Sequence, residues 1–353
     1  MHNYACRTAY RGHPRVLDVL AHTGTWTSTT TLFEVMTPWT GAAPTELVDE
    51  LVDRRILHQL DDRPVPEEQA LDRWRGWNPA AGFLHLTTKD VLYAPPGREQ
   101  GPRVVAEPEP PSLKEYPEAR RVALPPFGRD SAIASTLLQR RTWRRFAPGQ
   151  LSSEELSTLL GLTWAAQGWV ELEGAAPCPL KTSPSGGARH SLEAYVVALD
   201  VADVPAGTYH YHADEHVLEQ LGEGVEPGML EDMLPEQPWF HEAPVVVFMT
   251  SVFARIQWRY PFARAYRVLH IEAGHFGQTF CLVATSLGLA PFTTAALGDS
   301  GIERHLGIDG IGESVLYALG AGRRPSGVRW APDPYRDEAP GIGEPGWKCV
   351  GLI

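Results

Sequence analysis

Residues 264–289 read RAYRVLHIEAGHFGQTFCLVATSLGL and contain no proline. Apolar residues occur on nearly every face of a helix drawn through this stretch, which is typical of a long helix that is buried nearly all round. Three apolar runs typical of strands accompany it, at 193–200 (EAYVVALD), 243–251 (APVVVFMTS) and 314–320 (SVLYALG). The pattern predicts an α+β fold, a central sheet wrapped by helices, with the long helix in the core or at a dimer interface.

Two shorter amphipathic helices are predicted ahead of the first strand, at 131–141 and 152–164. The second opens with an S-x-x-E capping box formed by Ser152 and Glu155. We assign residues 129–335 to one domain on this basis. Residues 336–353 are rich in glycine and proline, which predicts an irregular C-terminal tail.

Residues 94–128 contain nine prolines, a density that disfavours helix and central strand and favours an extended connector. Before it, residues 44–57 place their apolar side chains on one helical face, and the turn-like DDRP follows at 61–64. This arrangement predicts a small winged-helix-like domain over 1–93. Acidic residues outnumber basic ones by three there, so we expect it to bind a peptide or a partner protein rather than DNA. A role in packing alone is the alternative.

The whole chain carries a formal net charge of −12, which would repel the phosphates of a nucleic acid. Its apolar runs fall well short of the roughly 20 residues that span a bilayer, and the N-terminus has no secretory signal pattern. We therefore expect no nucleic acid partner, no membrane contact and a cytoplasmic location. The four cysteines are too dispersed for a zinc ribbon, so no metal is expected: they are Cys6, Cys178, Cys281 and Cys349.

The sequence RRTWRRF at 140–146 is the first candidate for chemistry. In an extended segment Arg140, Thr142 and Arg144 point to one side, where two guanidinium groups and a hydroxyl would suit a phosphate. A solvated basic run is the alternative. The second candidate is TSPSGGAR at 182–189, where small residues allow the backbone to approach a flat ring closely. Neither a P-loop nor a Rossmann glycine pattern is present.

These two motifs resemble the nitroreductase superfamily of flavoproteins, because RRTWRRF is similar to its N-terminal RRSxRxF signature. Three further stretches resemble the SagB-type dehydrogenase branch, which includes azoline oxidases: SPSGGARHSLEAYVV at 183–197, PAGTYHYHADEHVLEQL at 205–221 and the long helical stretch at 264–289. The resemblance covers roughly residues 132–325. WRGWNPAAGFLHLTTKD at 74–90 is also similar to a segment that precedes this domain in the branch.

The resemblance implies a nitroreductase-like fold that binds FMN non-covalently at a homodimer interface. The matching positions for the phosphate and ribityl chain are Arg140, Arg141, Thr142 and Arg144, with Arg323 as a weaker phosphate candidate. Pro184, Ser185 and Gly187 would reach the flavin of the facing subunit. The segment Thr294, Ala295 and Ala296 would run past the ring.

The resemblance also implies an acid–base site. Azoline oxidases carry a Lys-Tyr pair where this sequence has Arg259 and Tyr260. Arginine stays protonated in proteins, so Arg259 would orient or stabilise an anion and Tyr260 would carry the proton. A structural ion pair and a packed ring are the alternative for these two residues.

The leading functional hypothesis is an FMN-dependent dehydrogenase that oxidises a thiazoline or oxazoline to a thiazole or oxazole. Its substrate would be a peptide or carrier-bound natural-product intermediate, and a cyclodehydratase or synthetase would be its partner. A flavin-dependent reductase or dehydrogenase acting on another small molecule is the first alternative. A non-catalytic scaffold of a modification complex is the second.

Overall fold

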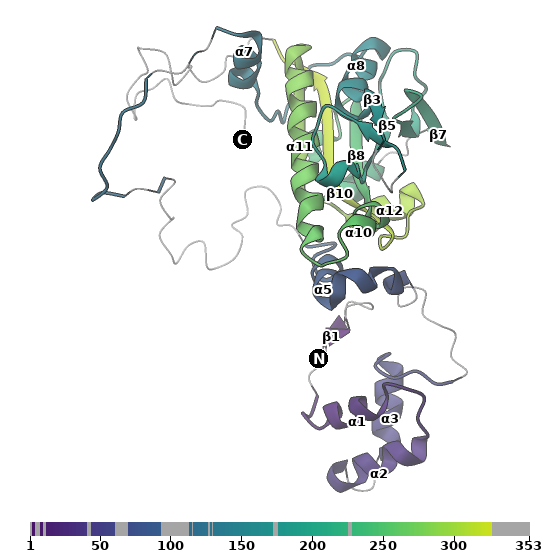
Figure 1. Cartoon of the computed structure of the whole chain (residues 1–353). Helices are drawn as coiled ribbons and strands as arrows, with labels where there is room; N and C mark the ends of the chain where they lie inside the picture. The colour runs from purple at the N-terminus through teal and green to yellow at the C-terminus, as the bar shows by residue number, and fades with distance from the viewer. Residues whose placement is uncertain are drawn as a thin grey trace. The chain divides into compact units, whose positions relative to one another are not determined.

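The computed structural model describes residues 2–3, 8–9, 12–40, 44–60, 70–92, 113–114, 116–125, 128, 130–171, 176–224 and 228–326. The predicted turn at 61–64, most of the proline-rich connector and the predicted tail at 336–353 lie outside these residues. The chain divides into two compact units (Figure 1). The first comprises Met1–Lys89 and Tyr260–Ala265, and the second comprises Asp90–Arg259 and Tyr266–Ile353.

The first unit contains a small helical core. Helices α1 (Val16–His22), α2 (Thr29–Thr40) and α3 (Pro44–Asp53) bury one apolar cluster: Val16, Val19, Leu32, Met36, Val48, Leu51 and Leu57. Helix α3 is shorter than the helix predicted at 44–57, because Arg55 adopts a left-handed backbone (φ 54°) that ends the regular turns. The wing expected after it lies outside the described residues.

The rest of the first unit is formed by sequence-distant segments. A short pairing joins β1 (His2–Asn3) to β2 (Thr8–Ala9). The 3₁₀ helix η1 (Asp72–Trp77) leads into α5 (Asn78–Thr87). Trp77 is fully buried and donates its indole N–H to the Tyr260 carbonyl at 3.0 Å. This bond joins the segment at 260–265 to the N-terminal part of the chain, an association that the sequence did not predict.

The second unit is built on a six-stranded sheet in which all neighbouring strands are antiparallel. Its spatial order is β7 (Val217–Glu223), β6 (Gly207–His212), β5 (Leu192–Ala198), β8 (Val245–Val252), β10 (Glu313–Arg323) and β9 (Leu289–Thr294). The three runs predicted as strands form β5, β8 and β10, which are neighbours in the sheet. β5 and β8 are its two central strands. A separate hairpin pairs β3 (Gly168–Val170) with β4 (Cys178–Leu180).

Helices cover both faces of this sheet. On one face α8 (Ser153–Trp164) and α11 (Ala265–Ser286) share a core with alternate residues of β5 and β8, including Val196 and Val247. On the other, α9 (Met229–Met233), η3 (Pro238–Phe240) and α12 (Asp299–Leu306) pack against Val197 and Phe248. This architecture confirms the predicted α+β fold with a sheet wrapped by helices. The capping box of Ser152 and Glu155 is also present at the start of α8.

Helix α11 is the longest helix in Figure 1, with 22 residues. Its sheet-facing side is tightly packed: a Cβ at Gly277 would lie 2.8 Å from the Tyr317 ring. The opposite side is exposed along a stripe spaced three and four residues apart: Arg267, His270, Ile271, Gly274, His275 and Gln278. The prediction of burial on nearly every face is therefore wrong for a single chain, because four polar residues, a glycine and the exposed Ile271 occupy this stripe. Among the described helices, none is long and apolar enough to cross a membrane.

Candidate functional site

The arginine-rich segment begins where α7 (Ala132–Gln139) ends. Arg141 donates to the Leu138 carbonyl at 2.9 Å and to the Arg140 carbonyl at 2.6 Å, so its guanidinium caps the C-terminus of that helix. Arg140 is half-buried, and its side chain has no hydrogen bond or ion pair among the residues that the structure describes. Burial raises the pKa of the Cys281 thiol to about 11, and the positive charge of Arg140 opposes that rise. Arg140 is therefore an unpaired cation close to α11.

Backbone hydrogen bonds fix the segment that follows against the edge of the sheet. The Trp143 N–H donates to the Pro291 carbonyl, and the Ala147 N–H donates to the Arg323 carbonyl, both at 2.9 Å. Trp143 is buried, Thr142 is half-buried and Arg144 is exposed. Trp143 therefore packs into the protein interior, while Arg144 is accessible to solvent.

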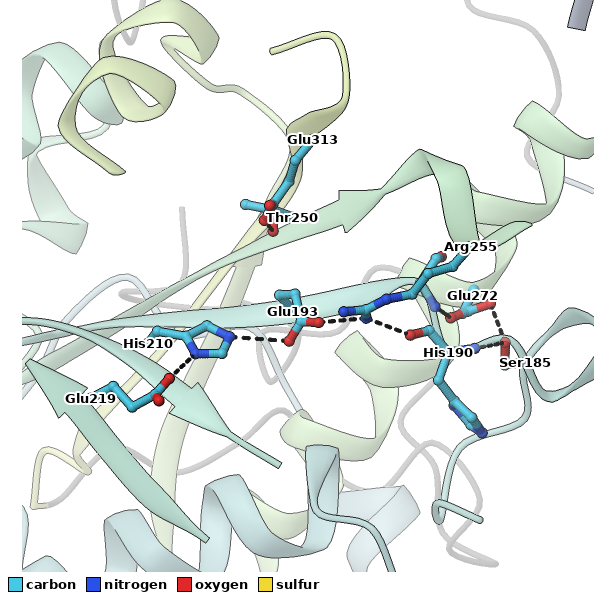
Figure 2. Close-up of polar contacts among 10 residues, drawn as sticks. Ser185, His190, Glu193, His210, Glu219, Thr250, Arg255, Glu272 and Glu313 are labelled. Carbon is cyan, nitrogen blue, oxygen red and sulfur yellow. Dashed lines mark hydrogen bonds and ion pairs between the residues drawn. The ribbon is translucent and has the colours of Figure 1, made fainter. Parts of the chain in front are cut away.

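The SPSGG segment is held by one buried carboxylate of α11. Glu272 is 1% exposed and accepts hydrogen bonds from the Ser185 hydroxyl at 2.6 Å and the Ser191 N–H at 3.1 Å. The Ser185 oxygen in turn accepts from the His190 N–H at 2.8 Å (Figure 2). Burial raises the pKa of Glu272, although these donors favour its ionised form. The loop is therefore positioned by α11 through a charge-assisted network.

Two further details define the shape of this loop. The Pro184 carbonyl accepts a hydrogen bond from Nδ1 of His275 at 3.2 Å, so a residue of the exposed α11 stripe contacts the loop. Gly187 adopts a left-handed backbone (φ 61°) and is exposed. Glycine takes this conformation without steric cost, and it leaves the backbone open to close approach. Pro184, Ser185 and Gly187 thus lie in one fixed turn.

The segment after β9 is held by Gln237. Its side-chain N–H donates to the Ala296 carbonyl at 2.7 Å, and its side-chain oxygen accepts from the Thr294 hydroxyl at 2.6 Å. The Ala296 N–H donates to the Thr294 oxygen at 3.1 Å. Ala295 is exposed between them. The segment predicted to run past a ring therefore presents backbone and a methyl group.

Arg323 is engaged within the fold. Its guanidinium makes two hydrogen bonds to the Glu155 carboxylate, at 2.6 and 2.7 Å, and a third to the Gln150 carbonyl at 2.9 Å. Burial alone would raise the pKa of Glu155, but the Arg323 guanidinium and the Ser152 N–H lower it below its ordinary value. This geometry favours a structural ion pair over the predicted phosphate contact.

The residues of the predicted acid–base pair, Arg259 and Tyr260, follow one another at the end of α10 (Phe253–Arg259). Arg259 is the last residue of this helix and is exposed. Tyr260 is half-buried, its carbonyl accepts from Trp77, and its ring makes an edge contact with Phe262 at 5.9 Å between centroids. The roles of both residues stay predictions.

The sequence analysis missed a cavity of about 640 Å³ between the β3–β4 hairpin, the SPSGG loop and the sheet. Eight of its lining residues have an ionisable side chain other than a thiol: Lys181, Arg189, His190, Glu193, His210, His212, Asp214 and Arg255. Burial would raise the pKa of Glu193, but hydrogen bonding to His210 and the charge of Arg255 lower it. The same hydrogen bond raises the pKa of His210. Figure 2 shows Glu193 between these two partners.

One signal in the sequence could have pointed to this region. Glu272 is the sole acidic residue in the 22 residues of α11, and a carboxylate surrounded by apolar residues requires buried donors. Lys181 and His190 flank the SPSGG motif, but nothing in their spacing indicates that they line one cavity. No group of three or more potential metal ligands occurs among the described residues.

The nitroreductase family model matches residues 137–323, just over half of the chain. The chain therefore belongs to the nitroreductase family, and this membership identifies it as an oxidoreductase. The nitroreductase-type protein MJ1384 of Methanocaldococcus jannaschii is 32% identical over 197 residues, which are 54% of this chain and 91% of that protein. The predicted superfamily is thereby confirmed.

Two further similarities are to a trifolitoxin-processing protein and to a chain of a microcin synthetase complex. The trifolitoxin-processing protein TfxB of Rhizobium leguminosarum bv. trifolii is 31% identical over 176 residues, which are 49% of this chain and 47% of TfxB. This chain thus spans about half the length of TfxB. A chain in the structure of the E. coli microcin synthetase McbBCD complex with truncated pro-MccB17 bound is 17% identical with a TM-score of 0.44, covering 88% of this chain and 97% of that chain.

Proposed function

We propose that this protein is an FMN-dependent dehydrogenase of the SagB type. It would oxidise a thiazoline or oxazoline to the aromatic azole on a peptide or carrier-bound intermediate. The observation that carries the proposal is the 31% identity over 176 residues to a trifolitoxin-processing protein. The quoted motifs RRTWRRF and SPSGGARH support the same branch of the family.

The residues present fit FMN. Arg140 is an unpaired, half-buried cation at a helix end, and a phosphate would supply the partner that it lacks. Thr142 is half-buried and Arg144 is exposed in the segment that follows, where both would contact the phosphate or the ribityl chain. Gly187 and Ala295 are exposed, so the backbone at both positions is accessible to a flat ring. FMN, when bound, supplies the two-electron redox chemistry.

The chain's own contribution to the reaction would be positioning and proton transfer. Removing a hydride from an azoline ring requires that a proton also leaves the adjacent carbon. Tyr260 would carry that proton, and the cationic Arg259 would stabilise the phenolate or orient the substrate. The N-terminal residues 1–93 would bind the peptide or a synthetase partner, and the catalytic unit would act as a homodimer in the cytoplasm.

A flavin-dependent reductase acting on a small molecule is the second candidate. Two observations favour it: the similarity to MJ1384 extends over 91% of that protein, and arginine replaces the lysine of azoline oxidases at position 259. An arginine cannot serve as the base that lysine provides.

Anaerobic stopped-flow spectroscopy separates the two functions. The purified full-length protein is first examined for bound flavin, and is then mixed with a thiazoline-containing peptide or with NADH and NADPH. A dehydrogenase bleaches the flavin with the thiazoline peptide, and the peptide loses two hydrogens by mass spectrometry. Bleaching of the flavin by NADH or NADPH, without bleaching by the thiazoline peptide, would support the reductase. A purified protein that binds no flavin would overturn both proposed functions.

A further inference from the structure

The cavity beside the SPSGG loop has an unbalanced set of charges. Arg255 forms an ion pair with Glu193 and donates to the His190 carbonyl at 3.1 Å. Arg189 donates to the Gly187 carbonyl at 2.9 Å and to the Cys178 sulfur at 2.7 Å. Both arginines are thus engaged by the protein itself.

The acidic groups of the lining are engaged as well. Glu193 contacts both Arg255 and Nε2 of His210, and the other ring nitrogen of His210 contacts Glu219 at 2.6 Å. Asp214 accepts a hydrogen bond from the Trp169 indole at 3.1 Å. Both carboxylates of the lining thus have a contact within the fold, and neither forms an ion pair with the further cation that the lining contains.

Lys181 is that further cation. It follows β4 directly, is half-buried and lines the cavity. Within the described part of the chain its ammonium group makes no hydrogen bond and no ion pair. Burial lowers the pKa of Lys181; the charge of Glu193 opposes this most strongly, the charge of Arg255 adds to it, and Glu272 opposes it more weakly. A partly desolvated ammonium without a partner is costly, and an anion in the cavity would compensate for the lost hydration.

His190 provides a second unsatisfied group in the same lining. The residue is 5% exposed, and its Nδ1 is buried without a hydrogen-bond partner among the described residues. Burial and then the charge of Lys181 lower the pKa of His190 to about 4, so the ring is neutral near pH 7. A neutral imidazole carries one N–H, and the ring donates a hydrogen bond to the Pro179 carbonyl. Nδ1 is therefore left as an acceptor that needs a donor.

The two unsatisfied groups define the chemistry of a ligand. Lys181 requires an anion, and His190 requires an N–H or O–H donor close to it. A carboxylate with a neighbouring amide N–H has both features. The cavity volume of about 640 Å³ lies within the range of roughly 300–1,000 Å³ that small-molecule and short peptide ligands occupy.

We propose that this cavity is a second binding site, which takes an acidic peptide residue with its carboxylate at Lys181 and an amide N–H at Nδ1 of His190. The carboxylate belongs either to a glutamate side chain or to a peptide C-terminus. The lining adjoins the SPSGG loop but includes none of the residues assigned to flavin and proton transfer: Arg140, Arg141, Thr142, Arg144, Pro184, Ser185, Gly187, Thr294, Ala295, Ala296, Arg323, Arg259 and Tyr260.

The test is isothermal titration calorimetry of the full-length protein with three tripeptides, measured without turnover. N-acetyl-Gly-Glu-Gly-amide presents a side-chain carboxylate, N-acetyl-Gly-Gly-Gly with a free C-terminus presents a terminal one, and N-acetyl-Gly-Gln-Gly-amide is the neutral control. At least one acidic peptide is expected to bind tenfold or more tightly than the glutamine peptide. Equal binding of all three, or binding of none, would overturn the proposal.

Substitutions of Lys181 then test whether the acidic peptide binds in this cavity. Lys181→Met should weaken the acidic peptide at least tenfold, and Lys181→Arg should retain most of the affinity because the charge is kept. Lys114→Met is the matched control, since Lys114 is exposed and contacts only Tyr116 in the described structure. An unchanged affinity in Lys181→Met would show that the peptide binds elsewhere.

A second measurement uses the unmodified protein, so it does not require that any variant folds correctly. The ¹⁵N resonance of His190 Nδ1 should shift when the acidic peptide is added, because a lone pair accepts a new hydrogen bond. A resonance that does not move at saturation would contradict the proposed contact. Since no redox step is measured, a protein that lacks flavin would refute the proposed function and leave this result interpretable.

Discussion

Arg323→Met is expected to reduce the stability of the second unit rather than to weaken flavin binding directly. Arg323 ends β10, and its guanidinium reaches the capping box that begins α8. It makes three hydrogen bonds there, two to the Glu155 carboxylate and one to the Gln150 carbonyl. A phosphate would have to replace this bidentate partner. The variant therefore decides between a structural role and a cofactor role for one residue.

The magnitude follows from geometry and exposure. The side chains of Arg323 and Glu155 are 34% and 20% exposed, so solvent screens the pair in part. Buried hydrogen bonds to charged groups contribute about 1.5–3 kcal/mol, whereas exposed ion pairs contribute about 0.2–1 kcal/mol. We expect an interaction energy of about 1 kcal/mol, which is roughly a fivefold change in the folding equilibrium constant.

A double-mutant cycle with Glu155→Gln isolates this interaction. Glutamine keeps the volume of Glu155 and can still accept from the Ser152 N–H, so the capping box is retained while the charge is lost. The free energy of unfolding is measured with urea for both single variants and the double variant. Arg304→Met is the control, because Arg304 is exposed and has no side-chain partner among the described residues.

The pH dependence gives a second check. The pKa of Glu155 is lowered in the folded protein from its ordinary value of 4.5, so its ionised form is favoured by folding. The contribution to stability is complete above that value and is lost as the pH falls through the lower, folded-state pKa. If the losses of unfolding free energy in the two single variants simply add up to the loss in the double variant at pH 7, the ion-pair interpretation is refuted. A loss of flavin affinity in Arg323→Met without any loss of stability would restore the phosphate assignment.

Three other substitutions test separate parts of the structure. Arg140→Ala should lower FMN affinity roughly 10- to 150-fold in equilibrium dialysis by removing a phosphate partner, whereas Arg120→Ala should leave it unchanged. Tyr260→Phe should slow flavin reduction by an azoline substrate about 10²- to 10⁴-fold in stopped flow; a rate equal to that of the unmodified protein would exclude proton transfer by this residue. Asp90→Ala should cost about 1–2 kcal/mol in urea unfolding, because the Asp90 carboxylate accepts from the Ser300 N–H and hydroxyl at the start of α12; an unchanged unfolding free energy would contradict this.

The sequence predicted the strands and helices that have a recognisable local pattern, such as a continuous apolar run or a capping box. Strand β8 reads VVVFMTSV and is buried over almost its whole length, so its apolar run was recognisable. Helix α8 was predicted with its correct cap because the S-x-x-E pattern is a local interaction. Both signals depend on residues close together in the chain.

The edge strands were missed for a physical reason. β7 reads VLEQLGE and is exposed along most of its length, so it carries no apolar run. β9 contains Pro291, a residue that disfavours a central strand. It is tolerated because β9 is the last strand of the sheet. β6 (Gly207–His212) was missed as well, although it is an inner strand and mostly buried, because its sequence GTYHYH is no continuous apolar run.

The candidate site was predicted only where its residues are adjacent in sequence. RRTWRRF and SPSGG are local motifs, whereas the cavity brings together residues from the hairpin, the loop, two strands and α10. Likewise, the engagement of Arg323 by Glu155 joins residues far apart in the sequence. Such pairings depend on strand order, which the sequence alone did not determine.

Glu272 supports both proposed sites, which determines how they can be tested separately. Its carboxylate holds Ser185 in the loop that we assign to the flavin, and through Ser185 it positions the backbone of His190 in the cavity. It also acts electrostatically on Lys181. A Glu272 variant would therefore disturb loop and cavity together, and a loss of either function in it would not be informative. Arg140→Ala and Lys181→Met each remove one cation that has no hydrogen bond or ion pair among the described residues, so a defect confined to one ligand in each variant would show that the sites are independent.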